Sequence, residues 1–433
     1  MAEFFRSPRP FFRSLWAMML VGLAIRLVVV AFAYPLQMVP GLDHQEFGYE
    51  VGKVARSLAL GQGFSSPLYG PTGPTAWIAP VYTLMVAGVF KFFGVFTATS
   101  AIVILTINSV LSVLTCIPVY AIARRTAGAV TAVWSGWAWA LFPFAIYFSA
   151  VRIWNYTLSA LLGALLFMVL LGLADASGYG KWALYGLLAG LSGLNLPAFL
   201  QSVPFLTLWV IHRRWKEGKP WLTRAVLAAV VAVAVIAPWT ARNYRVFGKF
   251  VPILDRFWLE FRTGNAESRD WEPPGEHPTT SEVEWQKYQK RGELGYEQER
   301  RERSLEYLRT HRAHFLVMTG RRFIYIWTGF WSFSREFLSD EPTAIPNAFF
   351  CTFLTLMMLK GLLQLFRNKS PAAWAYIWLL LTFFPVYYIT HVKVDFRHPV
   401  EPMVVVLVVY AFTWRAEADE QRGRSGATGE GQA

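Results

Sequence analysis

The stretch 15–34, LWAMMLVGLAIRLVVVAFAY, decides the fold of this chain. It is an almost unbroken apolar run, and a helix needs roughly 20 such residues to cross a bilayer core about 30 Å thick. Arg6, Arg9 and Arg13 precede it, which imitates a secretory signal. The run is long for a signal peptide, however, and Arg26 interrupts it. We therefore predict a retained first spanning helix whose N-terminal side, rich in arginine, is cytoplasmic.

The composition of the whole chain excludes a soluble globular protein. Of its 433 residues, 55% are hydrophobic and only 16% are charged. A net charge of +13 would suggest nucleic-acid binding in a soluble protein, but here Lys and Arg cluster at the ends of apolar runs, as the positive-inside rule expects. No nucleic acid is expected as a partner. Cys116 and Cys351 lie inside apolar runs, which predicts burial rather than a disulfide.

Further apolar runs predict an all-α polytopic membrane protein with about ten transmembrane helices and both termini in the cytoplasm. The run 101–123 ends at the basic pair Arg124 and Arg125, which is expected in the cytoplasm, so this helix begins outside. The run 76–94, which contains Pro80 and Lys91, is therefore expected to dip into the membrane or lie on it rather than cross it. The predicted crossings lie near residues 15–34, 101–123, 129–148, 156–173, 182–198, 200–211, 225–238, 349–366, 373–389 and 403–414.

We expect one integral-membrane domain over residues 1–433, with two external loops that carry helices at the membrane surface. In the first loop, 35–98, Phe47, Val51, Val54 and Leu58 have helical spacing and predict a short surface helix over 47–60. The tail 416–433 is polar and is predicted to be cytoplasmic and disordered.

The second external loop, 239–346, is predicted to hold two helices. Ser281 and Glu284 have the spacing of a capping box, which starts a charged helix over 281–307. The following stretch, 315–331, is amphipathic and aromatic, as expected of a helix that rests in the membrane interface.

The segment 41–67, GLDHQEFGYEVGKVARSLALGQGFSSP, concentrates groups suited to chemistry. Three candidate bases, Asp43, Glu46 and Glu50, are followed by two cations, Lys53 and Arg56. Transfer of a sugar from a lipid phosphate needs a carboxylate to accept the proton of the attacking hydroxyl and cations to stabilise the departing phosphate. An ordinary ion pair on a helix surface between Glu50 and Lys53 explains part of the same pattern.

Later external segments supply further candidate phosphate ligands, which are Arg152, Arg242, Arg245, Arg397 and His398. Arginine suits a phosphate because its planar fork can donate two hydrogen bonds at once. Arg242 and Arg245 follow a predicted span and could instead reach lipid headgroups. Arg397 is favoured because prolines fix its loop.

Neither a metal nor a nucleotide is required by the sequence. His391, Asp395 and His398 have a spacing compatible with a divalent cation, although loop histidines near a membrane more often form hydrogen bonds, so no metal ligand is assigned. No glycine-rich loop between a strand and a helix is present to hold a nucleotide phosphate.

Several motifs together resemble the integral-membrane GT-C glycosyltransferases. They are FGYEVGKVARSLALGQGFSSP, GPTAWIAPVY, APWTARNYRVFGKFVPI and DFRHPVEP, so the similarity covers most of the chain. The closest group is the bacterial protein-mannosyltransferase and aminoarabinose-transferase-like branch, often called family 39. The resemblance implies a polyprenyl-phosphate sugar donor, inversion at the anomeric carbon and a catalytic acid in the first external loop.

By this resemblance Asp43 is the first candidate base, with Glu50 and Glu46 behind it. The family often has two adjacent acids, whereas here Asp43 is followed by His44, which we place among the substrate-binding candidates. The chain also lacks the large soluble C-terminal domain of some relatives, so the external loops are expected to recognise the acceptor.

The predicted function is therefore an inverting glycosyltransferase of the bacterial inner membrane, acting at the external, periplasmic face. The acceptor is a hydroxyl of a lipid, a glycan or a protein, and membrane lipids surround the enzyme. A transporter or lipid flippase without covalent chemistry is the alternative, but such proteins place their sites near the membrane midplane, whereas these polar groups gather at one face. A noncatalytic subunit that retains the fold is a third reading.

Overall fold

The computed structural model describes residues 10–39, 46–68, 70–175, 178–265, 277–279, 281–333, 335–340 and 343–429. Within these ranges the chain is almost entirely helical, and the only extended pairing is an isolated bridge between Ser65 and Pro74. The predicted all-α fold class is confirmed. Asp43 and His44 lie outside the described residues, so their predicted roles stay predictions.

The helices follow one another along the chain with short connections. In the first half they are α2 (Pro10–Arg13), α3 (Leu15–Ala33), the 3-10 helix η1 (Tyr34–Met38), α4 (Glu50–Ala59), α5 (Pro80–Phe93), α6 (Ala98–Leu114), α7 (Cys116–Thr126), α8 (Ala129–Ala140), α9 (Pro143–Ala150), α10 (Tyr156–Leu173) and α11 (Tyr179–Asn195). In the second half they are α12 (Phe199–Lys216), α13 (Leu222–Phe247), α14 (Phe257–Gly264), α15 (Glu282–Thr310), α16 (Arg312–Thr328), α17 (Arg335–Asp340), α18 (Ala344–Arg367), α19 (Ala372–Thr382), α20 (Pro385–Ile389), the 3-10 helix η2 (Val394–Val400) and α21 (Glu401–Gly429).

Seven helical segments of the described chain are long and apolar enough to cross a membrane, and the α8–α9 pair, bent by 43°, makes an eighth if it is one span. The sequence predicted ten. The difference lies in α11, which has only 17 residues, and in α12, whose last turn is basic. Helix α5 has 14 residues, too few to cross, which agrees with the prediction for 76–94.

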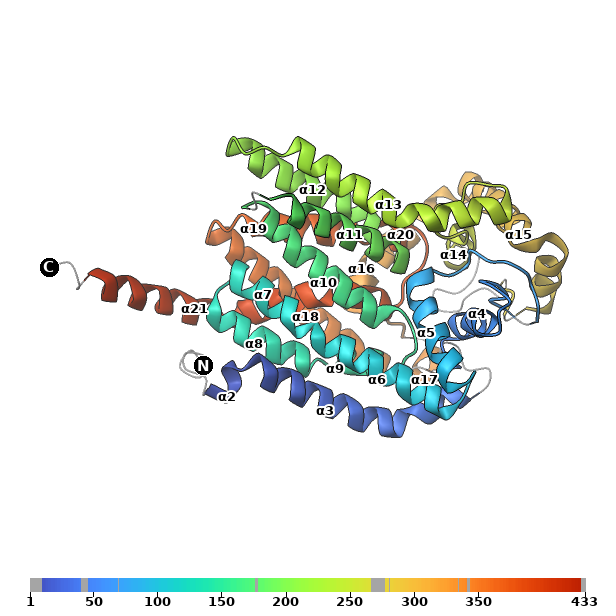
Figure 1. Cartoon of the computed structure of the whole chain (residues 1–433), viewed down its shortest axis with the longest axis horizontal. Coiled ribbons are helices and arrows are strands. Elements are labelled where there is room, and N and C mark those ends of the chain that lie inside the picture. The colour runs from blue at the N-terminus through green and yellow to red at the C-terminus, as the bar shows by residue number, and fades with distance from the viewer. Residues whose placement is uncertain are drawn as a thin grey trace.

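The long helices run side by side, and the hydrophilic helices α4, α14 and α15 lie at one end of the bundle (Figure 1). Helix α2 and the C-terminal part of α21 lie at the other end. We call the end that carries α4, α14 and α15 the loop end. These three helices come from the two long hydrophilic segments of the sequence, so the fold brings together groups that are about two hundred residues apart.

Arg26 illustrates how the bundle accommodates a charge inside a spanning helix. Its side chain is fully buried, and its Nη1 donates hydrogen bonds to the carbonyls of Gly22 at 2.9 Å and Ala140 at 2.7 Å. Its Nε donates to the hydroxyl of Ser112 at 3.1 Å. Because a buried charge without partners is costly, these bonds tie α3 to α6 and α8 and give Arg26 a structural role.

Two predicted boundaries differ from the structure. The surface helix α4 begins at Glu50 rather than at Phe47, because Phe47 and Tyr49 have positive φ angles of 52° and 47° and form a turn instead. At the C-terminus, α21 continues to Gly429, whereas a disordered tail was predicted from Ala416. There the buried carboxylate of Glu417 accepts a hydrogen bond from the backbone N–H of Thr131 at 2.7 Å, which holds the helix against α8.

The second loop follows its predicted pattern closely. Ser281 caps α15, and its hydroxyl accepts a hydrogen bond from the backbone N–H of Glu284 at 3.4 Å. Gly292 interrupts the helix with a φ of 68° and a ψ of 175°. The amphipathic helix predicted over 315–331 is α16, which is followed by Gly329 with a φ of 74°. Cys116 and Cys351 are buried and free, as predicted.

A close approach of two helices at Gly361 gives a direct test of the packing. A Cβ atom at Gly361 of α18 would lie 1.9 Å from the carbonyl oxygen of Leu407 in α21. We expect Gly361→Ala to push these helices apart and cost about 1–3 kcal/mol, seen as a lower thermal midpoint in detergent. The matched control is Gly172→Ala in α10, where nothing lies within 4 Å. Equal midpoints for the two variants would contradict this packing.

Candidate active site

Helix α4 places Glu50 in a buried position at the loop end. Of the apolar face predicted for this helix, Val51 and Val54 are buried in α4 and Leu58 is half-buried, while Phe47 is buried in the preceding turn. Glu50 begins the same helix and is only 4% exposed. Its Oε1 lies 3.8 Å from Nη1 of Arg256, so a first-loop carboxylate meets a guanidinium from the segment after α13.

Arg256 is the centre of this arrangement. Its Nε lies 2.5 Å from Oε1 of Glu260, one helical turn further on, and its guanidinium packs 5.5 Å from the ring centre of Trp77. Burial lowers the pKa of Arg256, but Glu260 and Glu50 outweigh it and hold the pKa above its usual value. The guanidinium is therefore a permanent cation between two carboxylates.

The same cluster extends to the loop after α20 through His391. Its Nδ1 lies 3.2 Å from Oε2 of Glu260. Burial lowers the pKa of His391 to about 4, so the imidazole is neutral at physiological pH. Burial would raise the pKa of Glu260, but Arg256 lowers it to about 2, which keeps this carboxylate ionised. Glu50, Arg256, Glu260 and His391 are called the Arg256 cluster below.

Two glutamates of α15 fasten the hydrophilic loops to this cluster. Glu293 accepts hydrogen bonds from the backbone N–H of Ala76 at 2.6 Å and from the hydroxyl of Thr75. Glu297 accepts bonds from two backbone N–H groups in the first turn of α14, at 3.0 and 3.2 Å. Helix α15 thus connects the first loop to the segment that carries Arg256.

These carboxyls make the docking of α15 sensitive to pH. Burial raises the pKa to about 6 for Asp255, about 7 for Glu293 and about 8 for Glu297. Because these pKa values are higher in the folded protein than in the unfolded chain, the folded state binds more protons between about pH 4 and pH 8. Their contribution to the stability of the folded protein is fully present below the pKa values of the unfolded chain. It is lost as the pH rises through the pKa values of the folded protein.

We therefore expect α15 to exchange its amide hydrogens faster, after correction for intrinsic rates, above about pH 8 than near pH 5. The double variant Glu293→Gln/Glu297→Gln should show little of this pH dependence, while Glu306→Gln, on an exposed position of α15, should keep it. The same pH dependence in all three proteins would contradict the assignment.

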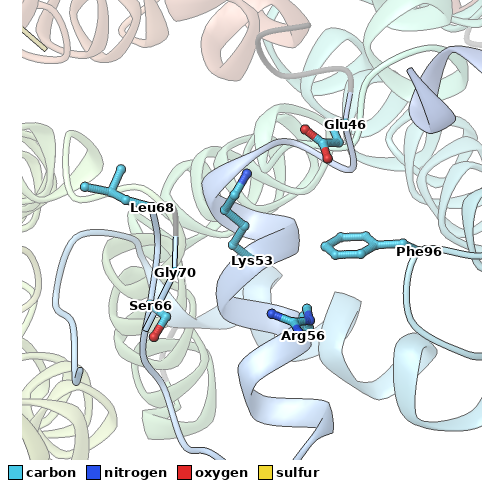
Figure 2. Close-up of a pocket in the computed structure, with 7 residues that line it drawn as sticks. All are labelled: Glu46, Lys53, Arg56, Ser66, Leu68, Gly70 and Phe96. Atoms are coloured by element: carbon cyan, nitrogen blue, oxygen red, sulfur yellow. The ribbon is translucent and has the colours of Figure 1, made fainter. Parts of the chain in front are cut away.

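The other first-loop candidates that the structure describes, Glu46, Lys53 and Arg56, line a cavity of about 140 Å³ beside α4. Its walls are formed by Glu46, Lys53, Arg56, Ser66, Leu68, Gly70 and Phe96 (Figure 2). Lys53 is half-buried, with its Nζ 3.4 Å from the ring centre of Tyr49, and Arg56 is exposed. Burial lowers the pKa of Lys53, opposed by Glu46 and Glu50.

Arg242 binds backbone carbonyls of the first loop, and its role in phosphate binding stays a prediction. Its Nη1 donates to the carbonyl of Thr75 and its Nη2 to that of Phe64, each at 2.7 Å, so it clamps the two ends of the loop 64–75. Arg245 is exposed, and Arg152 donates from Nε to the hydroxyl of Tyr147 at 2.9 Å. Of these three, only Arg245 matches a cation open to lipid headgroups, which the sequence had offered as the alternative.

Arg397 and His398 lie inside the bundle rather than in an open loop. Arg397 is 2% exposed, and its Nε lies 3.2 Å from Oε1 of Glu401 in α21. His398 Nδ1 lies 2.8 Å from the other oxygen of the same carboxylate, and its ring stacks on Trp139. Among the described residues, the carboxylate partner of Arg397 is thus Glu401, which stands four residues later and neutralises the charge locally.

His391 and His398, whose spacing is compatible with a divalent cation, do not form a metal site with other side chains in the described part of the chain. Within it, no group of three or more His, Cys, Asp or Glu side chains is placed to hold a metal ion. His391 pairs instead with Glu260, and His398 pairs with Glu401.

Comparison with known proteins gives structural neighbours but no sequence relative. No protein family and no curated protein matches the sequence. Among solved structures, the oligosaccharyltransferase of Archaeoglobus fulgidus, solved in complex with zinc and sulfate, matches with a TM-score of 0.51 over 91% of this chain. This chain has a GT-C-like fold. The two sequences are 14% identical and the match covers 48% of the neighbour, so the chain spans about half of that protein's length and the likeness concerns the fold.

The GT-C-like fold confirms the architecture predicted from the sequence motifs, while membership of family 39 gains no support from these comparisons. The structure also brings together charged residues that the sequence analysis did not single out. Arg256 and Glu260 stand four residues apart in a short hydrophilic stretch, a pattern typical of a surface ion pair. Their burial against Glu50 depends on contacts between distant segments, which the local sequence does not indicate.

Proposed function

We propose that this protein is an inverting glycosyltransferase that moves a sugar from a polyprenyl-phosphate carrier to an acceptor hydroxyl at the external face of the membrane. The observation that supports it best is the Arg256 cluster. Two carboxylates, one guanidinium and one imidazole from three distant segments meet at one end of a GT-C-like bundle. A polar cluster at one end of the bundle suits transfer at a membrane surface.

The proposed chemistry is a single displacement at the anomeric carbon. A first-loop carboxylate, with Asp43 as first candidate, accepts the proton of the acceptor hydroxyl while its oxygen attacks the anomeric carbon of the sugar. The bond from that carbon to the phosphate oxygen breaks, and the phosphate leaves with the electron pair and is stabilised by cations. Attack opposite the leaving group inverts the configuration.

Arg256 has a positioning role in this proposal. It holds Glu50 at 3.8 Å and Glu260 at 2.5 Å, so it fixes the first turn of α4, directly after the segment with the candidate base. The acceptor is a lipid, a glycan or a protein, the location is the bacterial inner membrane with both termini cytoplasmic, and no cofactor is required. Activity in the presence and absence of EDTA tests whether a divalent cation contributes.

The test uses the full-length protein in proteoliposomes with a panel of radiolabelled polyprenyl-phosphate sugars and membrane extract as the source of acceptors. The proposal predicts a covalently labelled product from at least one donor, absent from protein-free liposomes. Movement of a labelled lipid across the bilayer without any product would favour the transporter or flippase instead. Neither product nor movement with any donor would favour a noncatalytic subunit.

A further inference from the structure

The cavity beside α4 has a charged and hydroxylated wall. Figure 2 shows Lys53 and Arg56 projecting from one side of α4, between the segment with Ser66 and Gly70 and the ring of Phe96. Two cations and one acid, Glu46, face the cavity, which leaves an excess of positive charge. Such a wall favours an anion.

The size of the cavity limits the ligand to a small group. Its volume of about 140 Å³ is well below the roughly 300–1,000 Å³ of pockets that enclose drug-sized molecules. Among the described residues that line it, Leu68 and Phe96 alone contribute apolar side chains. Such a wall suits a small polar group better than a lipid chain.

The backbone around the cavity is strained. Phe47, Tyr49, Ser66 and Phe96 have φ angles between 47° and 58°, a region that residues other than glycine seldom adopt. Ser66 and Phe96 line the cavity, while Phe47 and Tyr49 lead into α4. Such strain costs of order 1–3 kcal/mol per residue and clusters at ligand-binding sites, where the surrounding structure holds it in place.

The loop that carries Ser66 is held from outside. Arg242 binds the carbonyls of Phe64 and Thr75 at its two ends, and Glu293 binds the backbone of Ala76. These bonds fix the wall opposite Lys53 without using any group that lines the cavity. The cavity is therefore preformed rather than assembled around its ligand.

We propose that this cavity binds a single anionic group, a phosphate or a carboxylate, on the acceptor. This proposal rests on the proposed function, because it assumes that the protein transfers a sugar to an acceptor. Lys53 and Arg56 bind the anion, and the Ser66 hydroxyl, which accepts a bond from Thr72 N–H at 3.2 Å, donates its own proton to it. Anchoring the acceptor here orients its hydroxyl toward the first-loop carboxylates.

The experiment measures binding of inorganic phosphate to the full-length protein in detergent, as a saturable rise in the thermal midpoint relative to chloride at equal ionic strength. We expect Lys53→Gln/Arg56→Gln to weaken phosphate binding roughly tenfold for each charge removed. The charge-preserving variant Lys53→Arg/Arg56→Lys should retain it. The matched control is Lys290→Gln/Arg301→Gln, which removes two exposed cations of α15.

Two competing ligands distinguish the source of the anion. Glucose 6-phosphate should replace inorganic phosphate, whereas polyprenyl phosphate in lipid nanodiscs should leave the phosphate response unchanged. Loss of the response with polyprenyl phosphate would assign the cavity to the carrier and overturn the proposal. An equal phosphate response in wild type and Lys53→Gln/Arg56→Gln would overturn it too, whether or not sugar transfer is detected, so its failure is separable from that of the proposed function.

Discussion

Replacing Asp43 by Asn is expected to reduce sugar transfer by roughly 10²–10⁴-fold while leaving the thermal midpoint unchanged. Asparagine keeps the size of the side chain but cannot accept the proton of the attacking hydroxyl. Glu50→Gln should reduce both activity and stability, because Glu50 is buried and neutralises Arg256. Initial rates and midpoints of the purified variants, measured under the same conditions, separate the two effects.

The comparison needs Glu46→Gln and a surface control. Glu46 lines the cavity beside α4, and Glu306→Gln removes an exposed carboxylate from α15 without touching the site. If Asp43→Asn is fully active while Glu46→Gln or Glu50→Gln is not, the base moves to that residue. Full activity in all three first-loop variants would count against a carboxylate base in this loop.

Replacing Arg256 by Ala is expected to cost about 3–5 kcal/mol of stability, because it leaves buried carboxylates without their cation. Glu50 and Glu260 both lose this partner, so the start of α4 should loosen as well. The thermal midpoint and amide exchange in α4 measure the two effects. Arg301→Ala, at an exposed position of α15, is the control.

A second variant separates lost charge balance from lost packing. Arg256→Met combined with Glu260→Gln removes a positive and a negative charge together and keeps most of the side-chain volume. We expect it to recover part of the stability that Arg256→Ala loses. If Arg256→Ala unfolds at the same temperature as Arg301→Ala, the ion pairs around Arg256 contribute little and the cluster is not the organising centre proposed here.

Much of the architecture could be predicted from the sequence because the local composition of each helix indicates whether it lies in the membrane or in water. The run 156–173 predicts α10 with its exact bounds, and the capping box at Ser281 marks the start of α15. These inferences depend on apolar length and local hydrogen bonding, which neighbouring residues determine.

The site was harder to predict because it depends on pairing between distant segments. The motif with Arg397 reads as a loop on the surface, yet its residues form η2 and bury their charges against Glu401. Conversely, Arg256 was overlooked because its partner Glu50 lies about two hundred residues earlier in the chain. Local sequence shows that a charge is present, but the partner that permits its burial becomes visible only in the fold.

The anomeric configuration of the product tests the central claim most directly. The purified wild-type protein would be given a polyprenyl-phosphate sugar of known configuration, and the linkage in the labelled product would be determined by NMR. A first-loop carboxylate acting as base in a single displacement predicts the inverted configuration. Retention of configuration, or no transfer from any lipid-phosphate sugar, would contradict it.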